Sequence, residues 1–164
     1  MTAYEASEWS DLFVAAAGAG AALAGLVFVA VSINIDRIIA GQGLPERALA
    51  TVLTLLMAVC VAIVGLIPGQ DHSALGAELL ALTALFAIVI VRLSIRSLPS
   101  GSTPRHWVVG RLFVIAIAVL PLLVGAISVL AEGGGGLYWI AAGIIGALVG
   151  AVANAWVLLV EILR

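Results

Sequence analysis

Five long apolar runs, separated by short polar breaks, set the pattern of the chain. They cover approximately residues 12–35, 46–67, 74–95, 107–130 and 137–160. A helix needs about 20 mostly apolar residues to cross the hydrocarbon core of a bilayer, so each run is long enough to span a membrane. The strict alternation typical of a barrel strand does not occur. The pattern predicts an all-α integral membrane protein, a single domain of five transmembrane helices over residues 1–164.

The breaks between the runs are short, and the longest is the Ser- and Pro-rich stretch 97–104. Short connections make consecutive helices antiparallel neighbours. Pro121 lies in the middle of the fourth run. Because proline has no backbone N–H, it removes the hydrogen bond to the carbonyl of Ile117 and predicts a bend there.

Charged residues separate by side of the membrane. With five spans, all seven basic residues fall on one side, and the other side receives acids alone. The basic residues are Arg37, Arg47, Arg92, Arg96, Arg105, Arg111 and Arg164. Since arginine-rich loops remain in the cytoplasm, the N-terminus is expected outside and the C-terminus in the cytoplasm. Some of these arginines could also contact anionic lipid headgroups, but orientation alone accounts for them.

Composition supports lipid as the solvent. The chain is 64% hydrophobic and 10% charged, whereas soluble domains have about 45–50% apolar and about 25% charged residues. A soluble domain of this size has too little interior to hide so much apolar surface. The expected surroundings are therefore a lipid bilayer, with no role for nucleic acid.

Small residues follow one line along the first run. Ala15, Gly18, Ala22 and Gly25 recur at steps of three and four, a spacing that holds one helix face against a partner. In lipid, helices associate through close packing, which Gly and Ala permit. Because residues 15–22 are all small, the first helix is expected to be approached from several directions and to be central in the bundle. A second packing seam is expected at Gly143, Gly146 and Gly150.

Polar residues gather in the inner half of the first two helices: Ser32, Asn34, Thr51 and Thr54. Polar groups at this depth seek interhelical hydrogen bonds, which favours a structural role. Asn154 in the fifth run is expected to bond in the same way. If the protein forms a ring with the first helix innermost, Ser32 and Asn34 would instead line a pore.

Two acid–base pairs, Asp36-Arg37 and Glu46-Arg47, flank the Gly-Gln-Gly turn at residues 41–43. Both pairs fall at the cytoplasmic ends of adjacent helices. We expect an interfacial ion pair across this hairpin, between Asp36 and Arg47. A partner-docking or gating site is the alternative.

Motifs for catalysis are missing from the sequence. No acid, base or histidine falls near a bilayer midplane, where an ionisable group would mark an ion or proton pathway. The two histidines, His72 and His106, fall on opposite sides of the membrane. A bis-histidine haem or dinuclear metal site within one chain is therefore not expected. The sequence predicts a protein that is not an enzyme and that holds no cofactor or metal.

The opening Tyr4…Trp9…Phe13, followed by the run at residues 21–34 (ALAGLVFVAVSIN after Ala21), resembles a set of small bacterial membrane proteins. Some of them carry a label as modulators of the FtsH membrane protease. The resemblance covers mainly the first helix and first hairpin, and it implies no catalytic residues. It implies a multi-pass protein of the bacterial plasma (inner) membrane.

Two functions remain open from the sequence. The first is a non-catalytic membrane interaction protein, an accessory, scaffold or regulatory subunit that packs through its small-residue seams. The second is a homo-oligomeric ion channel or small-solute pore lined by the first helix. Either function implies a homo-oligomer or a larger membrane complex.

Overall fold

The computed structural model describes residues 3–98 and 105–162, with the backbone alone at 105–107, 161 and 162. Every regular element within these ranges is a helix. They are the 3₁₀-helix η1 (Ala6–Trp9) and the α-helices α1 (Ser10–Ile33), α2 (Ile35–Ala40), α3 (Leu44–Gly65), α4 (His72–Arg96), α5 (Arg105–Leu130) and α6 (Leu137–Ile162). Five of the described helical segments are long and apolar enough to cross a membrane. The all-α, five-helix membrane fold predicted from the apolar runs is confirmed at this level.

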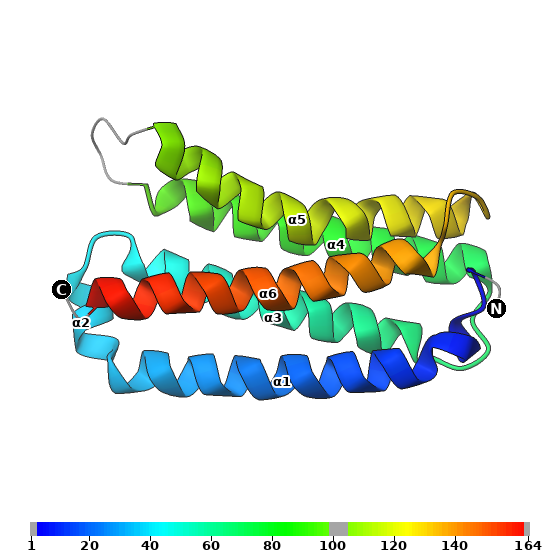
Figure 1. Cartoon of the computed structure of the whole chain (residues 1–164), viewed down its shortest axis with the longest axis horizontal. Helices are drawn as coiled ribbons and strands as arrows, with labels where there is room; N and C mark the ends of the chain where they lie inside the picture. Colours follow the sequence, from blue (N-terminus) through cyan, green and yellow to red (C-terminus); the bar gives the residue numbers. More distant parts are fainter. Residues whose placement is uncertain (1–2, 99–104, 163–164) are drawn as a thin grey trace.

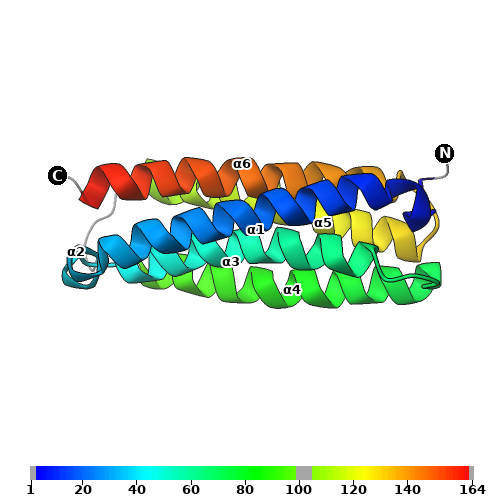
Figure 2. The ribbon, with the colours of Figure 1, turned by 90° about the horizontal axis from the view of Figure 1, so that it is seen from below.

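The long helices lie side by side, and the two chain ends lie at opposite ends of the bundle (Figures 1 and 2). α3 packs against α1, α4 and α6, and α5 packs against α4 and α6. Half of the most apolar stretch of α3 is buried, against 17% for α1. Within the single chain the expectation of a central first helix is therefore wrong, since α3 holds that place. Small residues permit close approach but do not specify which neighbour makes it.

α3 is central because its sequence buries side chains around most of its circumference. Leu55, Met57, Ala58, Val61 and Ala62 are all fully enclosed. α1 buries one face only, formed by Phe13, Ala16 and Gly20. α1 is consequently an outer helix that rests on α3.

The first helix ends earlier than its apolar run. Asn34 leaves helical geometry (φ −107°, ψ 20°), and its side-chain amide donates to the carbonyl of Ala30 at 2.9 Å. The short helix α2 follows and buries Ile38 against Ala48 and Leu158. Burial of Ile38 determines which side of α2 faces outward.

The turn between α2 and α3 requires a glycine. Gly43 has φ 73°, a left-handed conformation that side chains disfavour, and a Cβ there would collide with the backbone carbonyl of Ser97. This close approach places the first turn of α3, which carries Arg47, beside the end of α4, which carries Arg96.

α5 and α6 are close over one half of their length and diverge over the other (Figure 1). A Cβ at Gly146 of α6 would lie 2.6 Å from the carbonyl oxygen of Ile117 in α5. This is the carbonyl that loses its helical donor to Pro121. In Figure 1, the first half of α5 slopes away from α6, in agreement with the bend expected at Pro121.

The other end of the bundle is closed by the N-terminal segment. The backbone N–H of Leu137 donates to the carbonyl of Ala3 at 2.8 Å, and Trp9 meets Tyr138 edge to face with ring centroids 4.7 Å apart. Ser128 receives the N–H of Gly136 at 2.7 Å and donates to the carbonyl of Gly133. These contacts fix the α5–α6 turn against the start of the chain.

Candidate functional sites

The small-residue seam of α1 lies on the outside of the single chain. Ala15, Gly18, Ala22 and Gly25 are all exposed, and a Cβ added at Gly18 or Gly25 would meet nothing within 4 Å. Every exposed residue from 15 to 25 is Ala or Gly. The seam faces away from α3, so it packs against no other helix of this chain among the described residues.

The other long helices expose large side chains along much of their length, although α4 also exposes Ala74, Ala77 and Ala81 in its first half. α4 exposes Leu85 and Ile88, α5 exposes Phe113 and Leu120, and α6 exposes Ile145. Large aliphatic and aromatic side chains of this kind cover the helix backbone. Among the described helices, residues 15–25 of α1 form the longest stretch in which every exposed residue is Ala or Gly, because the exposed Glu78 interrupts the alanines of α4.

The second seam lies inside the bundle. Gly143 and Gly146 are buried against α5, and a Cβ at Gly150 would lie 3.0 Å from Val114. This seam is occupied by a neighbour within the chain, so it leaves no glycine face for an outside partner.

In the structure, the four residues of the expected polar patch do not form one hydrogen-bonded group. Ser32 is exposed, and its hydroxyl donates to the carbonyl of Phe28 at 2.8 Å. Thr51 and Thr54 lie in α3 and donate to the carbonyls of Arg47 and Ala50. Within the described ranges, no hydrogen bond joins Ser32 or Asn34 to either threonine. Asn154 of α6, expected from the sequence to bond between helices, donates its amide to Thr51.

The expected ion pair between Asp36 and Arg47 is wrong for the residues that the structure describes. Asp36 and Arg37 are exposed on α2, because burial of Ile38 turns them outward. Arg47 instead reaches toward α6, where its Nη2 donates to Oδ1 of Asn154 at 3.5 Å. Glu46 stays in the first turn of α3, where the helix dipole favours an acid.

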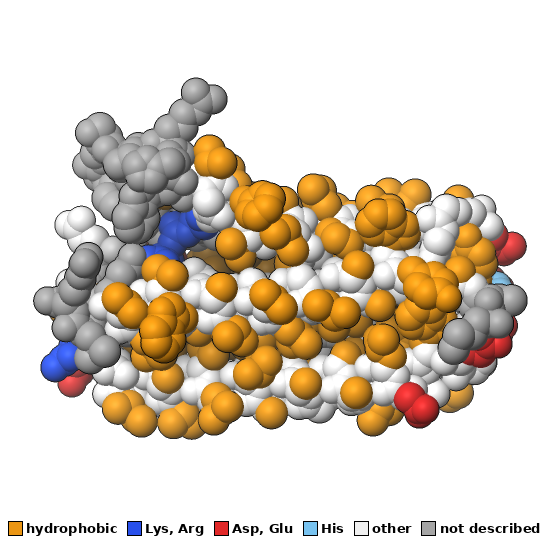
Figure 3. Space-filling view, in the orientation of Figure 1, with side chains coloured by type: hydrophobic (Ala, Val, Ile, Leu, Met, Phe, Trp, Pro, Cys, Tyr) orange, Lys and Arg blue, Asp and Glu red, His pale blue; other side chains and the backbone are white. Residues whose placement is uncertain are grey.

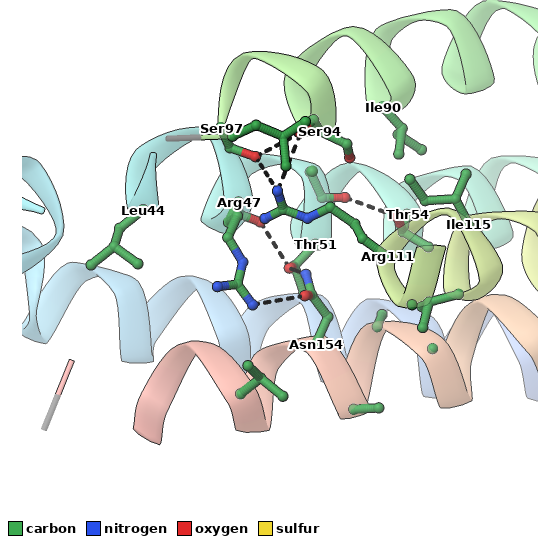
Figure 4. Close-up of a pocket in the computed structure, with 18 of the residues that line it drawn as sticks. Leu44, Arg47, Thr51, Thr54, Ile90, Ser94, Ser97, Arg111, Ile115 and Asn154 are labelled. Carbon is green, nitrogen blue, oxygen red and sulfur yellow. Dashed lines mark hydrogen bonds between the residues drawn. The ribbon is translucent and has the colours of Figure 1, made fainter. Parts of the chain in front are cut away.

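A cavity of about 830 Å³ lies between α3, α4, α5 and α6, at the end of the bundle that carries the arginines (Figure 4). Its wall on α6 extends from Gly150 to Val157. The sequence did not predict it, because its wall is assembled from segments of the chain that are far apart.

Two arginines from different helices reach this cavity. Arg111 of α5 donates through Nη1 to the carbonyl of Ser94 at 3.2 Å and to Oγ of Ser97 at 2.6 Å. Arg47 enters from α3 beside Asn154. Figure 4 shows both guanidinium groups in the same region of the cavity. Each is thus oriented by a polar side chain of a neighbouring helix.

The remaining wall is largely apolar. Leu44, Ile90, Val114 and Ile115 contribute aliphatic surface, and no acidic residue is among the described residues that line the cavity. In Figure 3, arginine side chains border a hollow on the side of the bundle, between α5 and α6. The cavity combines a cationic, hydrogen-bonding part with an aliphatic part.

Comparison with protein-family models, with curated proteins and with solved structures finds no match for this chain.

Proposed function

We propose that the protein is a non-catalytic membrane interaction protein that docks a transmembrane helix of another protein on the exposed face of α1. The observation that carries this proposal is that each exposed residue between 15 and 25 is Ala or Gly. Lipid tails are as apolar as aliphatic side chains, so hydrophobicity alone does not drive helices together in a bilayer. Close backbone approach does, and this face permits it.

The face has the dimensions of a helix contact. Eleven residues, 15–25, extend over roughly 16 Å at about 1.5 Å per residue. This is about half of the roughly 30 Å hydrocarbon core. One partner helix crossing α1 would cover this face. The proposed setting is a bacterial inner membrane, with the N-terminus outside and the arginine-bearing end of the bundle in the cytoplasm.

A homo-oligomeric pore is the second candidate, and the position of Ser32 favours it. Ser32 is exposed and continues the line of Ala22, Gly25 and Val29 along α1. Copies assembled around this line would place α1 at the centre of the oligomer, with Ser32 near its axis. Such a weakly polar path could gate by dewetting.

Native mass spectrometry of the protein released gently from its own membrane tests the proposal. A complex with a larger, different membrane protein is the expected result, and it identifies the partner. Because residues 21–34 resemble proteins labelled as FtsH modulators, a membrane protease is the first partner to look for. A homogeneous ring of four or more copies would overturn the proposal in favour of the pore.

The pore has a test of its own. If Ser32 lies on a conducting axis, Ser32→Leu and Asn34→Leu should each lower conductance in reconstituted bilayers. Unchanged conductance in both variants would reject the pore.

A further inference from the structure

We propose that the cavity between α3, α4, α5 and α6 binds an anionic phospholipid, with the headgroup phosphate held by Arg47 and Arg111. The inference does not depend on a partner at α1, because the cavity lies between other helices. It assigns a ligand class to a site that the proposed interaction function leaves unused.

The cationic part of the cavity suits a phosphate. Arginine presents a planar fork of N–H donors that matches phosphate oxygens. Here the two guanidinium groups come from α3 and α5, and hydrogen bonds to Asn154 and Ser97 orient them.

Hydroxyl groups extend the polar surface beyond the arginines. Thr51, Thr54 and Ser94 line the same space as the guanidinium groups (Figure 4). Thr51 and Thr54 already donate their hydroxyl protons to helix carbonyls, so their oxygens can accept from the hydroxyl groups of a glycerol headgroup.

The size and the apolar wall indicate an organic ligand rather than an inorganic ion. Pockets for organic ligands measure about 300–1,000 Å³, and this cavity measures about 830 Å³. Ile90, Val114 and Ile115 supply aliphatic surface to the same space. An acyl chain would cover that surface, whereas a free phosphate ion would leave it wet.

The position of the opening distinguishes a lipid from a water-soluble ligand. The hollow lies on the side of the bundle between α5 and α6 (Figure 3), the direction from which lipid reaches a membrane-spanning protein. It also lies at the arginine end, where anionic headgroups are expected. Basic pockets between transmembrane helices bind anionic headgroups in this way.

A native mass spectrometry titration of the purified full chain in detergent tests the proposal. The probes are dioleoyl phosphatidylglycerol, dioleoyl phosphatidylcholine and inorganic phosphate. We expect one phosphatidylglycerol per chain to bind about tenfold more tightly than phosphatidylcholine, and millimolar phosphate not to displace it. Equal binding of the two lipids, or full displacement by phosphate, would overturn the proposal.

Substitutions locate the lipid. Arg111→Gln removes a charged donor and should weaken phosphatidylglycerol binding about tenfold or more. Arg92→Gln is the matched control, because Arg92 is exposed on α4 and does not line the cavity. Equal affinity in both variants would contradict the assignment.

A second variant pair covers the case in which Arg111→Gln loosens the contact between α5 and α4. Ala153 lines the cavity and is exposed, so Ala153→Phe fills space without a buried clash. Val152→Phe places the same ring on the neighbouring exposed position outside the cavity. Only Ala153→Phe should weaken phosphatidylglycerol binding, and equal effects would reject the site.

Discussion

Thr51 of α3 and Asn154 of α6 are joined by a side-chain hydrogen bond although 103 residues separate them in the chain. Thr51 donates in turn to the carbonyl of Arg47 at 2.9 Å. Asn154 receives the guanidinium of Arg47 at 3.5 Å. One threonine and one asparagine thus link α3 to α6 and also orient an arginine at the cavity.

A double-mutant cycle measures this link. Thr51→Val and Asn154→Leu each remove one partner, and the double variant removes both. We expect a coupling energy of about 0.6 kcal/mol, with about 1.7 kcal/mol as the upper range for such bonds in membranes. Unfolding in mixed micelles gives the free energies. Strictly additive effects would show that the bond contributes nothing.

Glycines of the two seams should respond differently to a larger side chain. At Gly146 a Cβ would lie 2.6 Å from the backbone oxygen of Ile117, so Gly146→Val should separate α5 from α6 and lower the melting temperature. At Gly18 a Cβ meets nothing within 4 Å. Gly18→Val should therefore leave the melting temperature of the isolated chain nearly unchanged while weakening its association with a partner. Similar melting temperatures for both variants would contradict this distinction.

Two leucines that are two positions apart on α5 lie in different surroundings, one in the core and one on the outer surface. Leu122 is fully buried, whereas Leu120 is 57% exposed. Leu122→Ala removes packed atoms and should lower the free energy of unfolding by about 2–5 kcal/mol. Leu120→Ala should have little effect, because its side chain faces outward. The measurement is equilibrium unfolding of both variants under the same conditions.

The turn before α4 contains a carboxyl group, that of Asp71, whose pKa is lowered. The hydroxyl of Ser73 donates to the carboxylate of Asp71, and this bond holds the pKa of Asp71 below its ordinary 3.8. Backbone N–H groups of His72 and Ser73 add to the effect, and partial desolvation opposes it. Carboxyl ¹³C NMR should show a raised pKa in Ser73→Ala and a retained low pKa in Ser73→Thr.

The sign of the pH effect follows from that shift. A carboxyl with a lowered folded-state pKa stabilises the fold above its ordinary pKa, and this contribution is lost as the pH falls through the folded value. For Asp71 the loss is therefore confined to pH below about 3.8. The stability difference between wild type and Ser73→Ala should therefore be present at neutral pH and shrink as the pH falls below about 3.8.

Hydrophobic length was sufficient to predict the helices. Five apolar runs long enough for a bilayer became five long helices, since in lipid the backbone must satisfy its own hydrogen bonds. The seam residues were also recognisable from spacing. Spacing shows which residues share a helix face, but not whether that face meets a helix of the same chain. The structure places Gly146 against α5 and Gly18 on the outside.

Local sequence could not predict the polar contacts near the arginine end. Asp36 was expected to meet Arg47 because both flank one turn, yet the helix break at Asn34 and the burial of Ile38 separate them. Arg111 was interpreted as an orientation signal. Its contact with Ser97 and its place in the cavity depend on how α5 diverges from α6, which is a tertiary feature.

Site-specific photo-cross-linking in cells is the most direct test of α1 as a docking face. A photoreactive phenylalanine analogue would replace Val29, which is 55% exposed and lies one turn beyond Gly25 on the same line of α1, or Phe113, which is 64% exposed on α5. We expect position 29 to give an adduct with a different membrane protein and position 113 to give no discrete protein adduct. Lipid adducts alone at both positions, or the same protein adduct from both, would contradict it.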